Sequence, residues 1–89
     1  MLRRKVERKF FPGRRIAVSE CSGITSGYSG RVATDAERHA HMRLLETTDA
    51  YNLSLIRDGW IVCVYDTVRG KPLQHPITDC MVASRLTVM

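Results

Sequence analysis

Positively charged side chains gather at the start of this 89-residue chain, where they would suit the binding of phosphate groups. Residues 1–15 carry six more positive than negative charges, whereas residues 16–89 carry one more negative than positive charge. Because lysine and arginine displace condensed counterions from nucleic acid, such a stretch predicts salt-dependent binding to RNA or DNA. The candidate phosphate-binding residues are Arg3, Arg4, Lys5, Arg8, Lys9, Arg14 and Arg15.

The same stretch also has an apolar side. Leu2, Val6 and Phe10 recur at every fourth position, which predicts a short amphipathic helix that Pro12-Gly13 would end. An anionic membrane surface, a neighbouring subunit and plain solvation are the alternatives to nucleic acid. We assign residues 1–12 to a basic N-terminal arm and residues 13–89 to one folded domain.

The residue patterns typical of enzymes are weak in this chain. Cys21, Cys63 and Cys80 are scattered without metal-ligand spacing, and Cys63 alternates with valines as a buried residue would. His39 and His41 would share a face only on a strand, and no third ligand stands near them. A phosphate loop and a dinucleotide fingerprint are both missing. We therefore expect no metal or cofactor and favour a non-catalytic function.

The composition is that of an ordinary globular chain, with 44% hydrophobic and 26% charged residues. The longest apolar run, residues 60–65, is far too short for a membrane span. No apolar core of a secretory signal follows the basic start. These features predict a cytoplasmic protein with reduced cysteines and no transmembrane segment.

Alternating apolar residues predict a series of short strands. Residues 14–20 form the first, with Ile16 and Val18 pointing inward, and a second begins at Arg31. Residues 51–56 and 60–65 read as a hairpin joined by Asp58-Gly59, because both positions of that turn accept positive φ. A further turn surrounds residues 69–72, and residues 73–77 and 85–89 would be the closing strands.

Residues 34–46 fit both a helix and a strand. Thr34 and Glu37 form a capping-box pattern, and Ala36, Ala40 and Leu44 recur at helical spacing. The same segment also alternates as a strand would. Because a small β-barrel needs a long second strand here, we favour a strand extension and keep a short helix as the alternative.

Three glycines punctuate the loop between the first two strands. The run from Gly13 to Val18, followed by Gly23-x3-Gly27-x2-Gly30-x-Val32, resembles the KOW motif of SH3-like barrels over residues 13–32. The resemblance implies binding to RNA or to a nucleic-acid machine. It places Tyr28 where it would stack on an unpaired base or cap the barrel end, and Arg31 where it would reach a phosphate.

Together these features predict a mainly β domain, a small five-stranded SH3-like barrel behind a basic arm, that binds RNA or DNA by charge and shape. The alternative is a protein-interaction subunit or an oligomeric barrel, with Leu2, Phe10 and Phe11 as anchors. A third possibility is a pore-type reductase, because residues 73–76 loosely resemble a segment of the trimethoprim-insensitive dihydrofolate reductases. His75, however, stands where that family has tyrosine.

Overall fold

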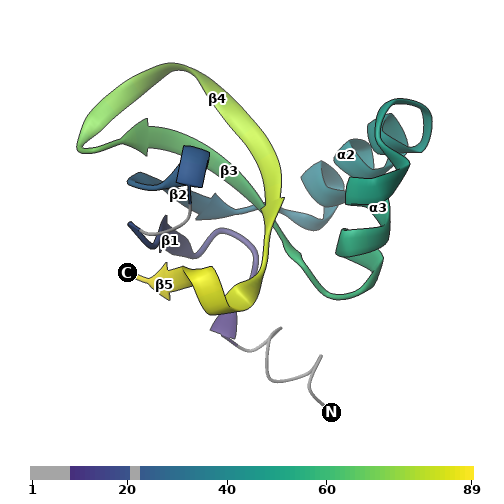
Figure 1. The fold of residues 1–89 in the computed structure, drawn as a ribbon, viewed down its shortest axis with the longest axis horizontal. Coiled ribbons are helices and arrows are strands. Elements are labelled where there is room, and N and C mark those ends of the chain that lie inside the picture. Colours follow the sequence, from purple (N-terminus) through teal and green to yellow (C-terminus); the bar gives the residue numbers. More distant parts are fainter. Residues whose placement is uncertain (1–8, 21–22) are drawn as a thin grey trace.

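One antiparallel sheet forms the centre of the protein (Figure 1). The computed structural model describes residues 9–20 and 23–89. The sheet strands are β1 (Arg15–Val18), β2 (Tyr28–Val32), β3 (Ile61–Val68), β4 (Lys71–Met81) and β5 (Leu86–Val88). Two helices, α2 (Asp35–Thr48) and α3 (Ala50–Arg57), lie between β2 and β3, and short 3-10 turns cover Gly23–Thr25 and Ala83–Arg85.

The strands follow the order β4-β3-β2-β1-β5. The first four form a meander, and β5 returns to pair with β1 through Ile16 and Val88. In the described ranges no ladder joins the edge strands β4 and β5, so the sheet is open. The expected mainly β fold is confirmed, whereas closure into a barrel is not seen.

The first hairpin agrees with the sequence in its strands and in its glycines. Ile16 and Val18 point into the core, as their alternation predicts. Gly23 and Gly27 adopt φ values of +70° and +80°, which favour glycine. Gly30 is required for another reason: a Cβ there would collide with the carbonyl oxygen of Val64 in the neighbouring strand. Gly30 lies inside the second strand, which begins at Tyr28, three residues earlier than expected.

The segment after β2 is a helix, so the favoured strand extension was wrong. The Thr34 hydroxyl accepts a hydrogen bond from the Glu37 N–H at 3.1 Å, and the Glu37 carboxylate accepts one from the Thr34 N–H at 2.9 Å. This capping box satisfies two N–H groups at the start of α2. Of the helix residues only Leu45 is fully buried, so local propensity and capping decide the conformation here more than burial does.

Residues 51–56 are also helical, so the predicted Asp58-Gly59 hairpin was wrong. Asp49 caps α3 by accepting a hydrogen bond from the Asn52 N–H at 3.0 Å. At the other end, the N–H of Gly59 donates to Ile56 and that of Trp60 donates to Leu55, which is a Schellman ending. Gly59 has the positive φ that was expected, +110°, but it ends a helix. Tyr51, in the first turn of α3, is 72% exposed.

The remaining turn and strands follow the sequence more closely. Arg69 and Gly70 both have positive φ and connect β3 to β4, where a turn was predicted. The predicted strand at residues 73–77 lies inside the longer β4, and that at 85–89 contains β5. The 3-10 turn Ala83–Arg85 lies between the two.

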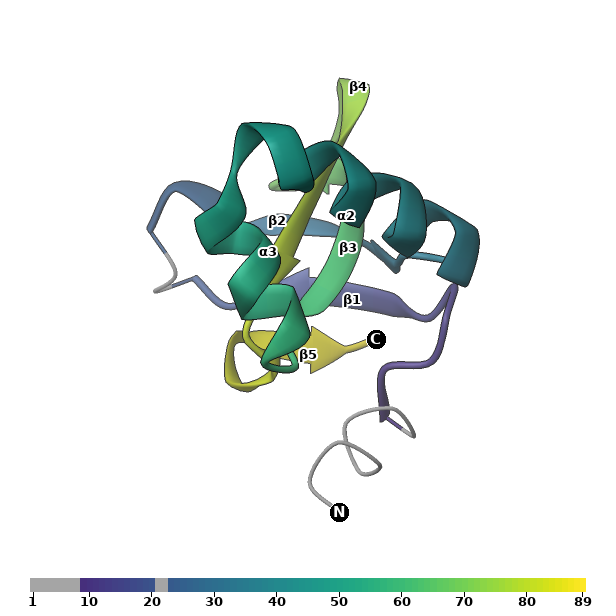
Figure 2. The same cartoon turned by 90° about the vertical axis from the view of Figure 1, so that its right-hand side faces the viewer.

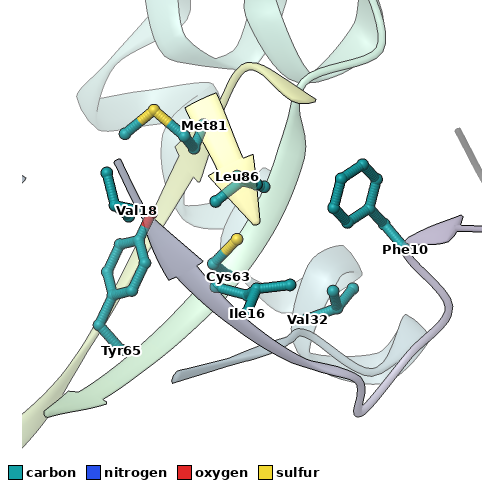
Figure 3. Close-up of a cluster of buried hydrophobic side chains, with 8 residues drawn as sticks. All are labelled: Phe10, Ile16, Val18, Val32, Cys63, Tyr65, Met81 and Leu86. Atoms are coloured by element: carbon teal, nitrogen blue, oxygen red, sulfur yellow. The ribbon is translucent and has the colours of Figure 1, made fainter. Parts of the chain in front are cut away.

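Apolar side chains form a cluster on each face of the sheet. The inner cluster comprises Phe10, Ile16, Val18, Val32, Cys63, Tyr65, Met81 and Leu86 (Figure 3). This cluster contains Met81 of the edge strand β4 and Leu86 of the opposite edge strand β5. Because side chains from both edges pack together, the sheet is strongly curled. The helix-side cluster comprises Ala33, Leu45, Leu53, Ile56, Val62, Val64 and Cys80, where α2 and α3 cover the opposite face (Figure 2).

Candidate functional site

The basic arm meets the folded domain at residues 9–14. Arg3, Arg4, Lys5 and Arg8 lie outside the described residues. Phe10 is buried in the inner cluster, which fixes the base of the arm to the domain. The Lys9 ammonium lies 5.6 Å from the centroid of the Phe10 ring, and the Arg14 guanidinium lies 5.2 Å from that of Phe11. Each cation therefore makes a cation–π contact with the neighbouring aromatic ring.

Arg15 is held by a carboxylate from a distant part of the chain. Its two terminal nitrogens donate to the two oxygens of Asp66, at 2.7 and 3.1 Å. These hydrogen bonds lower the pKa of Asp66 to about 2 and raise that of Arg15. A bidentate pair of this kind fixes the guanidinium in the plane of the carboxylate.

Arg31 is paired in the same way. Its terminal nitrogens donate to the two oxygens of Glu37 at 2.6 and 2.8 Å, so that β2 is tied to the capping box of α2. Arg15 and Arg31 stand opposite each other in neighbouring strands, where like charges would repel. Asp66 and Glu37 neutralise this pair. The two arginines predicted to bind phosphate therefore have internal partners.

Tyr28 lies half-buried at the start of β2. Its ring packs edge-on against the fully buried Tyr65, with ring centroids 5.6 Å apart and planes at 88°. It also packs against the inner cluster. The ring thus contributes to the core, and part of the side chain remains exposed to solvent at the end of the sheet.

Two cations that were not among the predicted binding residues, Arg69 and Lys71, lie on the side of the sheet end where Tyr28 stands. Tyr28 pairs with Val68, and Val68 pairs with Lys71 across the β3–β4 turn, which also carries Arg69. The turn itself was recognisable from Arg69-Gly70. Its position beside Tyr28 depends on strand pairing over some forty residues, which no local pattern indicates.

A largely apolar groove of about 800 Å³ opens between the base of the arm, the helices and the start of β3. Phe10, Trp60 and Ala83 line it, and its wall also carries two acidic side chains, Asp35 and Asp58, and one basic side chain, Arg38. Residues from the two apolar clusters meet in this groove. It was not predicted, because α3 was expected to be a strand.

The structure places the described cysteines and the two neighbouring histidines as follows. Burial raises the pKa of the Cys63 thiol to about 12 and that of Cys80 to about 11, so both stay protonated. His39 and His41, two apart on a helix, cannot share a face. Among residues 9–20 and 23–89, no three His, Cys, Asp or Glu side chains gather as metal ligands would.

No described helix combines the length and apolar character that crossing a bilayer requires. Comparison with protein-family models, curated proteins and solved structures gave no match for this chain. The functional assignment accordingly depends on its own residues and their geometry.

Proposed function

We propose that this protein is a small non-catalytic nucleic-acid-binding module whose basic N-terminal arm contacts backbone phosphates. The separation of charge carries the proposal: residues 1–15 hold an excess of six positive charges, and residues 16–89 are nearly neutral. Binding of this kind reads charge and shape, because phosphate contacts carry no sequence information.

The internal ion pairs indicate that the basic residues of the arm and those of the body have different roles. Arg15 and Arg31 each donate two hydrogen bonds to a carboxylate, so their charge is already compensated. Lys9 and Arg14 have no carboxylate partner among the described residues. We therefore assign phosphate binding to the arm with Lys9 and Arg14, and a structural role to Arg15 and Arg31.

For the fold we propose an SH3-like architecture with a pair of helices inserted between its second and third strands. Four observations support it: the meander of β1 to β4, the return of β5 to β1, the 3-10 turn before β5 and the curled inner core. The glycine pattern of the KOW motif fits the same proposal. NMR contacts between backbone protons of β4 and β5 would establish closure, and their absence would leave an open sheet.

The function is tested with two variants that remove the same charge from different places. The arm variant replaces four cations with glutamine: Arg3, Arg4, Lys5 and Arg8. The body variant does the same at four positions in the helices and before β5: Arg38, Arg43, Arg57 and Arg85. With labelled oligouridylate at low salt, we expect the arm variant to lose most of its affinity and the body variant to retain it. Equal losses would show that only net charge matters, and would overturn the arm's role.

The apolar groove favours a second candidate function, a protein-interaction module. Its apolar lining fits a bulky apolar side chain of a peptide. Its two carboxylates, Asp35 and Asp58, outnumber its one cation, Arg38, which favours a basic residue next to that side chain. A random-peptide display library selected on the protein should then enrich that motif, and Ala83→Gln, which narrows the groove, should abolish the selection. Enrichment of no common motif would remove this candidate.

A further inference from the structure

The end of the sheet opposite the base of the arm places an aromatic ring and a cation on one face. Tyr28 of β2 stands opposite Val68 of β3, and Val68 stands opposite Lys71 of β4. Directly paired residues of an antiparallel sheet point to the same face, so these three side chains form one row. Tyr28 belongs to the side that carries the inner cluster, and Lys71 is therefore on that side too.

Arg69 is held next to this row by the backbone of the glycine loop. Its N–H donates to the Gly27 carbonyl oxygen at 2.9 Å, although Arg69 has an unfavourable φ of +48°. Its side chain passes over Gly27, where an added Cβ would lie 2.9 Å from the Arg69 Cγ. Gly27 therefore provides the space in which the arginine stem lies. The strained backbone persists because the surrounding contacts hold it in place.

The charges at this end of the sheet are not compensated as those of Arg15 and Arg31 are. Arg69 and Lys71 are exposed and make no ion pair within the described ranges. Asp66, the nearest acidic residue along β3, is committed to Arg15. Glu20 is the other acidic residue close in sequence to this end of the sheet; it lies between β1 and the glycine loop. In the same loop, Ile24 is 94% exposed and adds apolar surface.

We propose that Tyr28, Arg69 and Lys71, here called the tip site, form a second contact for single-stranded nucleic acid. The inference rests on the proposed function and extends it to a defined place on the body. Arg69 and Lys71 would bind backbone phosphates, and the exposed part of the Tyr28 ring would stack on one unpaired base. A single strand is favoured over a duplex because only unpaired bases offer a face for stacking.

The phosphate contacts are tested by a double variant with a matched control. R69Q/K71Q removes the two tip cations, and R57Q/R85Q removes two exposed cations elsewhere. For labelled oligouridylate we expect the tip variant to reduce the salt slope of log K by about one to two, since each lost phosphate contact lowers it by about 0.7. The control should keep the slope of the unmodified protein. Circular dichroism verifies that each variant is folded.

The stacking contact is tested by a pair of substitutions at one position. Tyr28→Phe keeps an aromatic ring, whereas Tyr28→Leu keeps an apolar side chain without one. We expect Y28L to weaken single-strand binding by about five-fold or more, with Y28F close to the unmodified protein and duplex binding the same in all three. Equal affinity of Y28L and Y28F would overturn the stacking role.

The outcomes separate this inference from the proposed function. If the unmodified protein fails to bind any oligonucleotide at low salt, the proposed function and the tip site both fall. If the arm variant loses binding while R69Q/K71Q behaves like R57Q/R85Q, the proposed function stands and the tip site is overturned.

Discussion

Arg15 and Arg31 have a different role in the structure from the one that the sequence predicts. Both were expected to bind phosphate, and both donate paired hydrogen bonds to carboxylates, Asp66 and Glu37. Asp66 lies 51 positions from Arg15 in the sequence, so strand pairing alone brings them together. Glu37 was recognisable as a capping residue, and its second role toward Arg31 became visible only in the fold.

The Arg31–Glu37 pair makes stability depend on pH. Hydrogen bonds from Arg31, and then from the Thr34 backbone, lower the pKa of Glu37 from 4.5 to about 2. A carboxyl whose pKa is lower in the folded state stabilises the protein fully above its ordinary pKa. That contribution is lost as the pH falls from about 4.5 to about 2.

We expect Glu37→Gln to be less stable than the parent at neutral pH and to lose less stability on acidification. Urea unfolding across that pH range measures both effects. Glu46→Gln, an exposed change on the same helix, is the control and should follow the parent curve. An E37Q curve parallel to that of the parent would contradict the assigned ion pair.

Tyr65 gives a second prediction at the residue scale. Its hydroxyl is buried and makes no hydrogen bond of ordinary geometry among the described residues; its one polar contact is with the weakly hydrogen-bonding thiol of Cys63. Burial raises the pKa of Tyr65 well above the ordinary value. Removing an unsatisfied polar group costs little, so Tyr65→Phe should leave the free energy of unfolding unchanged or raise it by up to about 1 kcal/mol. A loss of about 1 kcal/mol or more in urea unfolding would show that the hydroxyl has a partner.

At the scale of elements, the sequence predicted where each helix or strand lies better than it predicted whether the segment is a helix or a strand. The strands around Ile16 and Val62, and the turn at Arg69, lie where their patterns indicate. Residues 50–57 do not, because Asp-Gly after an apolar run suits both a hairpin and the end of a helix, and both require positive φ. The deciding features are the Asp49 cap and the burial of Leu53 and Ile56 at helical spacing.

Gly59→Val tests the ending of α3. Gly59 has φ of +110° and no neighbour within 4 Å of an added Cβ, so backbone strain alone would act. We expect a loss of about 1–3 kcal/mol in the free energy of unfolding. Arg57→Val, in the last turn of the helix, should cost only about 0.5 kcal/mol of helix propensity. If the two variants were equally stable, Gly59 would not hold the positive φ that ends the helix.

For the whole molecule, hydrophobic pattern and glycine spacing predicted a mainly β domain of five strands, which the structure confirms, and a closed barrel, which it does not show; the pair of helices was not predicted. Two helices occupy the connection between β2 and β3, where the expected barrel would have continued as strand. These helices leave the β2–β3 pairing intact, so the strand pattern on either side gives no sign of them. The basic arm was evident from charge alone, whereas the tip site and the groove arise from long-range pairing.

The central claim is that a phosphate-binding arm is attached to a largely neutral body. Its most direct test is the slope of log K against log salt for labelled oligouridylate, measured for the unmodified protein and the arm variant. We predict a steep negative slope that falls by about 0.7 for each arm cation that contacts a phosphate. The same slope in both proteins, or no binding at low salt, would contradict the claim.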